Sequence, residues 1–251
     1  MKLSYDNVKR FVAHINLKKV GAYGQKKIID SNILIIGLGG LGSPIALYLA
    51  AAGIKNIGIV DNDTIDISNL HRQILFTEKD IGKPKVEITN NKLKQINSKI
   101  NVKKFFTKIH ITNIQKIIKK FNIIIDGTDN FNSKLLINDF CKKNKKILIS
   151  GAISKFLGQI FVFDFKKKNS PCLRCFMPDK PETEEQNCQS EGILGTLAGI
   201  TGTIMANETI KEILNFKSLC GYILMINSQD FSIKKIKLTK NKYCSKKHGK
   251  I

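Results

Sequence analysis

The sequence predicts an α/β fold that is Rossmann-like, with a mostly parallel sheet, flanking helices and a C-terminal antiparallel extension. The first observation is the segment ILIIGLGGLGSPIALYLAAAGIKNIGIVDND at 33–63, which places a glycine-rich turn and a helix between two apolar runs. A strand, helix and strand within about thirty residues are typical of a right-handed βαβ unit. The second observation is that further apolar runs follow at 121–126 and 147–150, each after a polar helical segment.

The N-terminal elements can be assigned in order. Residues 1–30 are predicted to be helical, with Gly21 and Gly24 as interruptions, and 32–37 to be a buried strand. A helix then begins with Pro44 in its first turn and stops at Gly53, because proline suits a helix start and glycine a helix end. A second strand covers 56–60.

The middle of the chain continues the alternation. We expect a polar helix near 85–97, a strand at 101–106, the strand 121–126, a helix starting near Phe131 and the strand 147–150. Parallel strands deliver their carboxyl ends to one edge of the sheet, where open α/β folds bind ligands. Asp61 and Asp129 both follow such strands.

After about residue 158 the pattern changes to strands without intervening helices of similar length. The strands are expected at 158–165, 221–226 and 231–238, with a small-residue helix at about 192–216. In the last strand Phe231 and Ile233 have one parity and Ile236 and Leu238 the other, which predicts a bulge or twist at Lys234–Lys235.

The charge of the chain is strongly basic, at a formal +22 over 251 residues. Because the basic residues are spread along the whole chain and only three of 42 are arginine, we interpret this as compositional bias and expect no nucleic-acid partner. In a lysine-rich chain each remaining arginine, at 10, 72 and 174, is a candidate for a site that needs the planar guanidinium fork.

The location of the protein is predicted to be cytoplasmic. The first residues, MKLSYDNVKR, contain no apolar signal region, and the longest uncharged apolar run, 192–206, is shorter than the roughly 20 residues of a membrane-spanning helix. Six cysteines in such a chain indicate thiols, a metal site or catalysis rather than a disulfide framework.

The glycine turn indicates a phosphate-bearing ligand. Gly37, Gly39 and Gly42 fit the pattern G-x-G-x-x-G, in which backbone N–H groups at a helix start face an anion. Asp61 lies 19 residues beyond Gly42, where an acid can accept ribose hydroxyls. A nicotinamide cofactor and another nucleotide both fit this motif.

Two basic residues favour a polyphosphate over a nicotinamide. The motif SNLHRQ at 68–73 contains Arg72, whose guanidinium is a planar fork, and the motif GKPK at 82–85 contains Lys85, whose ammonium is a point charge. Asn69 is either a phosphate contact or a turn residue. Asp129 is a candidate Mg²⁺ ligand or a helix cap, a role that Asn130 could fill instead. Asp63 and Asp66 are interpreted as turn residues.

The cysteines give two further candidates. Cys172 and Cys175 have the C-x-x-C spacing of half a zinc site, and Cys244 with His248 could supply the other half; a redox pair or plain thiols are the alternative. Cys188 stands alone in QNCQSEG, as a candidate nucleophile or a bystander.

The motifs GLGGLGSP, VDNDTIDISNLHRQ, GKPK, GTDN, CLRC and QNCQSEGILG, in this order, resemble the ThiF/MoeB/HesA adenylyltransferases, bacterial relatives of ubiquitin-activating enzymes. The resemblance runs from about residue 10 to residue 244. It implies a single domain over 1–251, with a nucleotide-binding part at 1–158 and a carrier-binding and zinc part at 159–251.

The resemblance also implies an activity: ATP with Mg²⁺ adenylates the C-terminal Gly-Gly carboxylate of a ubiquitin-like sulfur carrier. The segments look closest to the members that activate ThiS in thiamine biosynthesis, with MoeB-type activation of the molybdopterin carrier as the near alternative. The implied roles are the phosphate turn for Gly40, the ribose for Asp61, phosphates for Asn69, Arg72 and Lys85, Mg²⁺ for Asp129, and a link to the carrier for Cys188. A sulfur donor protein and a homodimer are implied as partners.

Two departures from the family pattern bear on this expectation. Ala13 replaces an arginine that in relatives reaches the ATP of the neighbouring subunit, so Arg10 or Lys18 compensates or activity is lowered. Lys247 replaces the last zinc cysteine, which leaves His248 as the substitute ligand for Zn²⁺. A non-catalytic carrier-binding scaffold is therefore an alternative; a nicotinamide-dependent oxidoreductase is another, although the sequence shows no proton-relay pair for it.

Overall fold

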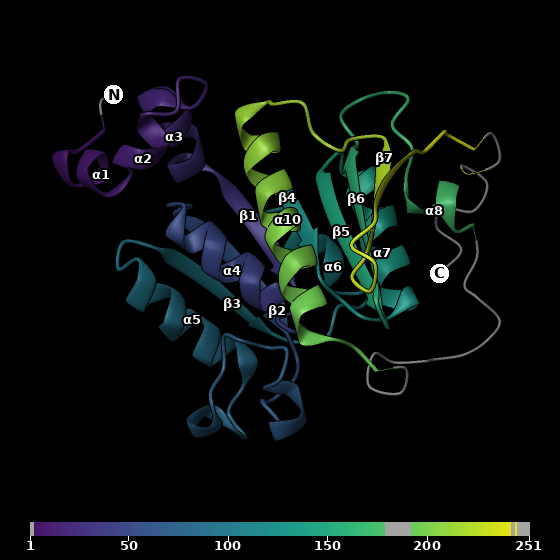
Figure 1. Ribbon diagram of the computed structural model, residues 1–251, viewed down its shortest axis with the longest axis horizontal. Helices are drawn as coiled ribbons and strands as arrows, with labels where there is room; N and C mark the ends of the chain where they lie inside the picture. Colours follow the sequence, from purple (N-terminus) through teal and green to yellow (C-terminus); the bar gives the residue numbers. More distant parts are fainter. Residues whose placement is uncertain (1–2, 179–191, 242–243, 245–251) are drawn as a thin grey trace.

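A computed structural model describes residues 3–178, 192–241 and 244. Its centre is one eight-stranded sheet with the order β3-β2-β1-β4-β5-β6-β7-β8 (Figure 1). The first five strands of this order pair in parallel and the last three pair antiparallel, which confirms the predicted fold class. The strands are β1 (Asn32–Ile36), β2 (Asn56–Asp61), β3 (Asn101–Phe106), β4 (Ile123–Asp126), β5 (Ile147–Ser154), β6 (Leu157–Asp164), β7 (Tyr222–Asn227) and β8 (Ile233–Lys237).

Helices cover both faces of the sheet (Figure 1). One face carries α4, α5 and α10, and the other carries α6 and α7. The helices of the described residues are α1 (Tyr5–Arg10), α2 (Val12–Ile15), α3 (Gly21–Asp30), α4 (Gly42–Ala51), α5 (Lys85–Ile96), α6 (Ile114–Ile118), α7 (Phe131–Lys143), α8 (Leu173–Phe176) and α10 (Gly195–Leu214), with short 3-10 turns at Ile67–Asn69 and Glu78–Asp80.

The strand β1 shows why a continuous apolar run forms the centre of the sheet. Successive side chains of a strand point to opposite faces, so Ile33 and Ile35 join the core under α4 and α10, whereas Leu34 and Ile36 join the core on the α7 side. All four are buried because both faces are covered. The predicted stop after α4 is confirmed, since Gly53 has a left-handed φ of +101°.

The turn between β1 and α4 depends on a close backbone approach at Gly42. A Cβ on Gly42 would lie 2.0 Å from the carbonyl oxygen of Gly37, whereas a Cβ on Gly39 would lie 3.7 Å from its nearest neighbour, Gln73 Nε2. We expect Gly42→Ala to lower the free energy of unfolding by about 3 kcal/mol, because overpacking next to backbone atoms forces the turn to move. The measurement is urea denaturation, with Gly39→Ala as the matched control that changes stability little. Equal stability of the two variants would contradict the packing role.

Of the bulge or twist expected at Lys234–Lys235, the bulge is wrong. The strand β8 pairs with β7 in continuous antiparallel register, with Lys235 opposite Leu224 and Lys234 opposite Met225. The physical reason is exposure: all of β8 lies open to solvent, so neither parity of side chains has to reach a core.

The N-terminal residues form three helices rather than one run (Figure 1). Gly21 interrupts them as expected, with a φ of +57°, but Gly24 does not: it lies inside α3 and is buried, with Leu214 of α10 3.1 Å from where its Cβ would be. Among the described helices none is long and apolar enough to cross a lipid bilayer.

Candidate functional site

A cavity of about 530 Å³ opens at the carboxyl edge of the parallel strands. This volume is in the range of nucleotide and cofactor sites. The predicted residues that line it come from the glycine turn, the end of β2, the loop before α5 and the turn after β4: Gly37, Gly39, Gly40, Asp61, Arg72, Lys85 and Asp129.

The glycine turn forms the floor of the cavity. Gly37 has a φ of +88°, and a Cβ there would lie 2.8 Å from the carbonyl oxygen of Gly127, so the ends of β1 and β4 approach closely. Gly42 lies outside the cavity lining and serves the packing of α4 against the turn.

Asp61 links the end of β2 to the glycine turn. Its carboxylate accepts hydrogen bonds from the N–H groups of Leu38, at 2.7 Å, and Asp63, at 2.8 Å. Burial raises the pKa of Asp61 above its ordinary value, and the Lys85 ammonium and the two N–H groups oppose that shift. A fixed carboxylate at this position can accept hydroxyl groups of a sugar.

Lys85 is more enclosed than the sequence indicated. It is the first residue of α5, its side chain is 5% exposed, and its Nζ lies 3.0 Å from Oδ2 of Asp63. Asp63, which was expected to be a turn residue, is therefore the ion-pair partner of Lys85. The pair holds a positive charge at the cavity wall in a defined position.

Arg72 brings the second positive charge. Its Nη1 donates to the carbonyl oxygen of Ser68 at 2.8 Å and lies 2.7 Å from Nε2 of His71. Asp66 has the predicted turn role, since its carboxylate accepts from the N–H and hydroxyl of Ser68. Asn69, in the same loop, is buried and lies outside the cavity lining.

The turn after β4 is supported by a buried acid that the sequence analysis did not single out. Asp126 is fully buried; it accepts from Ser150 Oγ at 2.6 Å, from Lys134 Nζ at 3.2 Å and from Thr128 Oγ1 at 2.6 Å. Because this network fixes Thr128, it also fixes the next residue, Asp129.

Asp129 is exposed at the cavity, and its carboxylate hydrogen-bonds to no other part of the described chain. The cap of α7 is Asn130, whose side chain accepts from the N–H of Ser133 at 2.9 Å. Of the two cap candidates the structure therefore selects Asn130. The carboxylate of Asp129 stays available to a cation beside a phosphate.

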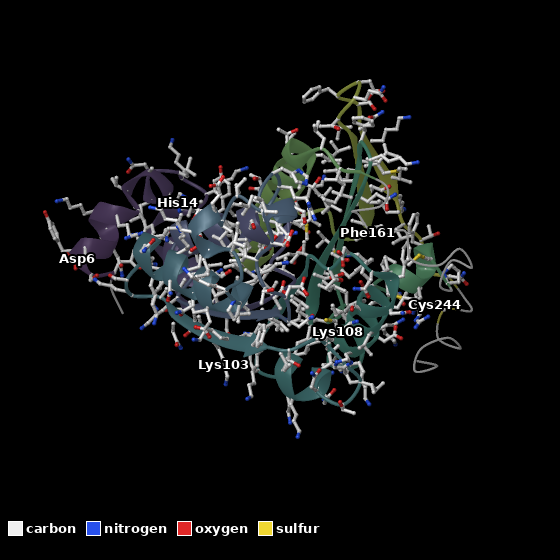
Figure 2. The ribbon with its side chains drawn as sticks, turned by 90° about the horizontal axis from the view of Figure 1, so that it is seen from below. Asp6, His14, Lys103, Lys108, Phe161 and Cys244 are labelled. Carbon is white, nitrogen blue, oxygen red and sulfur yellow. The ribbon has the colours of Figure 1, made fainter. Side chains whose placement is uncertain are left out.

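Three cysteines meet outside the lining of this cavity. The sulfur atoms of Cys172, Cys175 and Cys244 all lie within 4.8 Å of one another, with Sγ–Sγ distances of 3.9 Å for Cys172–Cys175 and 3.1 Å for Cys172–Cys244. Figure 2 shows Cys244 at the opposite end of the molecule from Asp6 and His14.

The three sulfur atoms form a ligand set that could hold a metal ion. Hydrogen bonding from Cys172 lowers the pKa of Cys175 below its ordinary value. Lys142 Nζ lies 3.7 Å from the sulfur atoms of both Cys172 and Cys244 and offsets negative charge there. Two sulfur ligands of a tetrahedral zinc, at Zn–S distances of ~2.3 Å, lie about 3.8 Å apart, which is close to the Cys172–Cys175 spacing.

Arg174, between the paired cysteines, is one of the three candidate arginines, and it does use its planar fork. Its Nε and Nη2 donate to the carboxylate of Asp139 at 2.9–3.0 Å, and both residues are buried. Next to it, the N–H of Leu173 donates to Oδ1 of Asn138 at 2.9 Å. The C-x-x-C turn is thereby attached to α7.

Some predicted residues lie outside the described part of the chain: Cys188, Lys247 and His248. Other residues line the cavity without having been predicted, notably Gln73 and Lys134. Gln73 had a usable signal, because it completes the SNLHRQ motif, whereas Lys134 had none beyond its place in a helix after β4.

The fold and cavity define a nucleotide-binding α/β protein whose site combines a glycine turn, an acid at the end of β2 and two positively charged side chains. The sequence model of the ThiF family matches residues 11–246, so the chain belongs to the ThiF family. This confirms the resemblance and disfavours the nicotinamide-dependent oxidoreductase.

Individual relatives carry related names. A "Probable molybdopterin-synthase adenylyltransferase" of Porphyra purpurea is 46% identical over 239 residues, which are 94% of this chain and 62% of the relative. A "Sulfur carrier protein adenylyltransferase" of Thermus thermophilus is 32% identical over 97% of this chain and 92% of its own length. The chain thus spans about three fifths of the first relative.

Solved structures support the fold. The crystal structure titled E. coli MccB with ATP superposes with a TM-score of 0.78 at 22% sequence identity, covering 96% of this chain and 80% of that one.

Proposed function

We propose that this protein adenylates the C-terminal carboxylate of a ubiquitin-like sulfur carrier, with ATP as the nucleotide donor. The observation that carries the proposal is the placement of Arg72 and Lys85 on the same cavity as the glycine turn and Asp61. A polyphosphate needs such fixed cations, whereas hydride transfer to a nicotinamide does not. The names of the relatives support the same reaction class.

The proposed reaction is a displacement at the α-phosphorus of ATP. An oxygen of the carrier's terminal carboxylate forms a bond to this phosphorus, the bond to the bridging oxygen breaks, and pyrophosphate leaves with that electron pair. Arg72 and Lys85 stabilise the negative charge that builds on the phosphate oxygens. The glycine turn donates N–H groups to the phosphates, and Asp61 accepts the ribose hydroxyls.

Mg²⁺ fits the site because Asp129 offers a free carboxylate beside the glycine turn. When bound, the cation would neutralise phosphate charge and assist the departure of pyrophosphate. Asp126 accepts hydrogen bonds from Thr128 and Lys134, and these bonds fix the turn that carries Asp129.

The identity of the carrier has two candidates. The segments quoted above look closest to the members that act on ThiS, whereas the relative with 46% identity is named for molybdopterin synthase. The test is to incubate the enzyme and ATP with each purified carrier and to measure the mass of the acyl adenylate, about 329 Da above the carrier's. The carrier with the higher kcat/KM is the substrate, and no adduct with either would contradict the proposal.

We further propose that Zn²⁺ is held by Cys172, Cys175 and Cys244, with His248 as fourth ligand. The metal would tie the C-terminal residues to the C-x-x-C turn, and zinc accepts three sulfurs and one nitrogen. We expect about one zinc per chain in protein purified without a histidine tag, and less in His248→Ala. The control Cys220→Ser should keep its zinc, because Cys220 lies outside the cluster. Metal-free, folded protein with three rapidly titrating thiols at 172, 175 and 244 would contradict the site.

Cys188 has a separate expected role in sulfur handling after adenylation. Attack of a carboxylate on ATP needs no thiol, so Cys188→Ala should form acyl adenylate at an unchanged rate and fail only in a later step with the sulfur donor protein. Mass spectrometry of the carrier measures both steps. Loss of the adenylate itself would show that Cys188 belongs to the adenylation site or to its packing.

A homodimer is also proposed, on the family resemblance. Ala13 stands where relatives reach the neighbouring subunit with an arginine, and Arg10 already donates within its own chain to the carbonyl oxygen of Ile96. Lys18 is therefore the better candidate for that contact. Sedimentation equilibrium measures the dimer, and Lys18→Ala with unchanged ATP affinity would remove Lys18 from the site.

A further inference from the structure

Gln73 lines the cavity and carries a buried hydrogen-bond acceptor that has no partner in the described residues. It follows Arg72 in the loop before α5, is 4% exposed and lines the cavity. Within the described residues, four buried side-chain oxygens lack a partner: Ser43 Oγ, Gln73 Oε1, Thr89 Oγ1 and Thr201 Oγ1. Of these four, Gln73 Oε1 alone belongs to a residue that lines the cavity.

The position of the amide places it over the glycine turn. Its Nε2 lies 3.7 Å from where a Cβ on Gly39 would be, and the Cγ of the neighbouring Arg72 lies 3.6 Å from the corresponding point on Gly40. Gln73 is held there by its backbone, since its N–H donates to Asn69 and its carbonyl oxygen accepts from Phe76. The Nε2 end of the amide therefore lies against the glycine turn, and Oε1 is the buried atom that remains without a donor.

The chemistry of an acceptor restricts what it can bind. A buried carbonyl oxygen is costly without a donor, and a polyphosphate at neutral pH presents acceptors only. The other substrate of the proposed reaction does present a donor, because a polypeptide tail has a backbone N–H next to its terminal carboxylate.

We propose that Oε1 of Gln73 accepts a hydrogen bond from the last peptide N–H of the carrier's Gly-Gly tail. This bond would orient the terminal carboxylate toward the α-phosphorus. The inference rests on the proposed function and adds a residue that recognises the second substrate rather than ATP. Removing the N–H of the carrier should therefore lower kcat/KM for the carrier and leave the KM for ATP unchanged.

The first experiment changes the carrier and leaves the enzyme intact. A semisynthetic carrier with an ester oxygen in place of the last peptide N–H keeps the tail length and the carboxylate but has no donor. With the wild-type enzyme we expect kcat/KM for this carrier to fall about tenfold relative to the amide carrier. Equal values for the two carriers would overturn the inference, whether or not any Gln73 variant folds.

The second experiment combines the two carriers with the variant Gln73→Met in a double-mutant cycle. Methionine keeps the side-chain length and removes the acceptor. The variant should lose about tenfold with the amide carrier and little more with the ester carrier, because both changes delete the same bond. Independent, additive losses would overturn the inference. So would a raised Mg²⁺ requirement with unchanged carrier KM, since Gln73 would then bind a metal-bound water.

The experiment with the amide carrier distinguishes a failure of the proposed function from a failure of the role of Gln73. If the proposed function fails, the wild-type enzyme would form no acyl adenylate even with the amide carrier. A normal reaction with the amide carrier and no effect of the ester rejects the role of Gln73 alone.

Discussion

Arg72→Ala and Lys85→Ala should each lower the rate of adenylation about a hundredfold while the fold stays intact. Loss of one preorganised charge at a developing oxyanion costs about 3 kcal/mol of transition-state stabilisation. Lys85 is held by Asp63 and Arg72 by the carbonyl oxygen of Ser68, so each charge is in place before the nucleotide arrives. Arg72→Lys should also be impaired, because lysine keeps the charge and loses the planar fork.

The matched control for these variants is Lys83→Ala. Lys83 lies two residues before Lys85, is exposed, and donates to the carbonyl oxygen of Lys79 outside the cavity lining. Its removal should leave the kinetics unchanged, as judged from carrier-dependent pyrophosphate release. Rates in Arg72→Ala and Lys85→Ala that match the control would remove this loop from the reaction.

Arg174→Ala should destabilise the protein by about 3–5 kcal/mol, the usual result when one partner of a buried ion pair is removed. The guanidinium of Arg174 and the carboxylate of Asp139 are both buried, so the variant takes the guanidinium away from a carboxylate in the interior. Guanidinium chloride denaturation measures the loss.

Two controls separate charge pairing from packing. The double variant Arg174→Met, Asp139→Leu removes both charges and should recover most of the stability, because a buried pair replaced by apolar groups is often neutral. Lys104→Ala breaks a partly exposed pair with Glu87 and should cost no more than about 1 kcal/mol. A loss in Arg174→Ala as small as that in Lys104→Ala would contradict the role of the pair.

The parallel half of the fold could be predicted from sequence because its signals are local. Buried strands such as β1 are continuous apolar runs, and β1 ends at the glycine-rich turn, so the element can be recognised from neighbouring residues alone. The edge strand β8 could not be predicted in detail, because alternation carries information only where one face is buried, and β8 is exposed throughout.

The candidate site was predictable where residues share a motif and unpredictable where they meet through tertiary packing. Arg72 and Lys85 follow from short motifs, and both line the cavity. The burial of Lys85, the network around Asp126 and the meeting of Cys244 with the C-x-x-C turn depend on distant parts of the chain. Gly42 shows the converse: it fits the phosphate motif, yet its place is set by the contact with Gly37.

ATP–pyrophosphate exchange in the presence of a purified carrier that ends in Gly-Gly is the most direct measurement of the proposed activity. Labelled pyrophosphate should enter ATP only when enzyme, Mg²⁺ and carrier are all present, because the acyl adenylate forms reversibly. A carrier that lacks its last glycine should abolish the exchange. Tight carrier binding without any exchange would contradict the account and identify the protein as a carrier-binding scaffold.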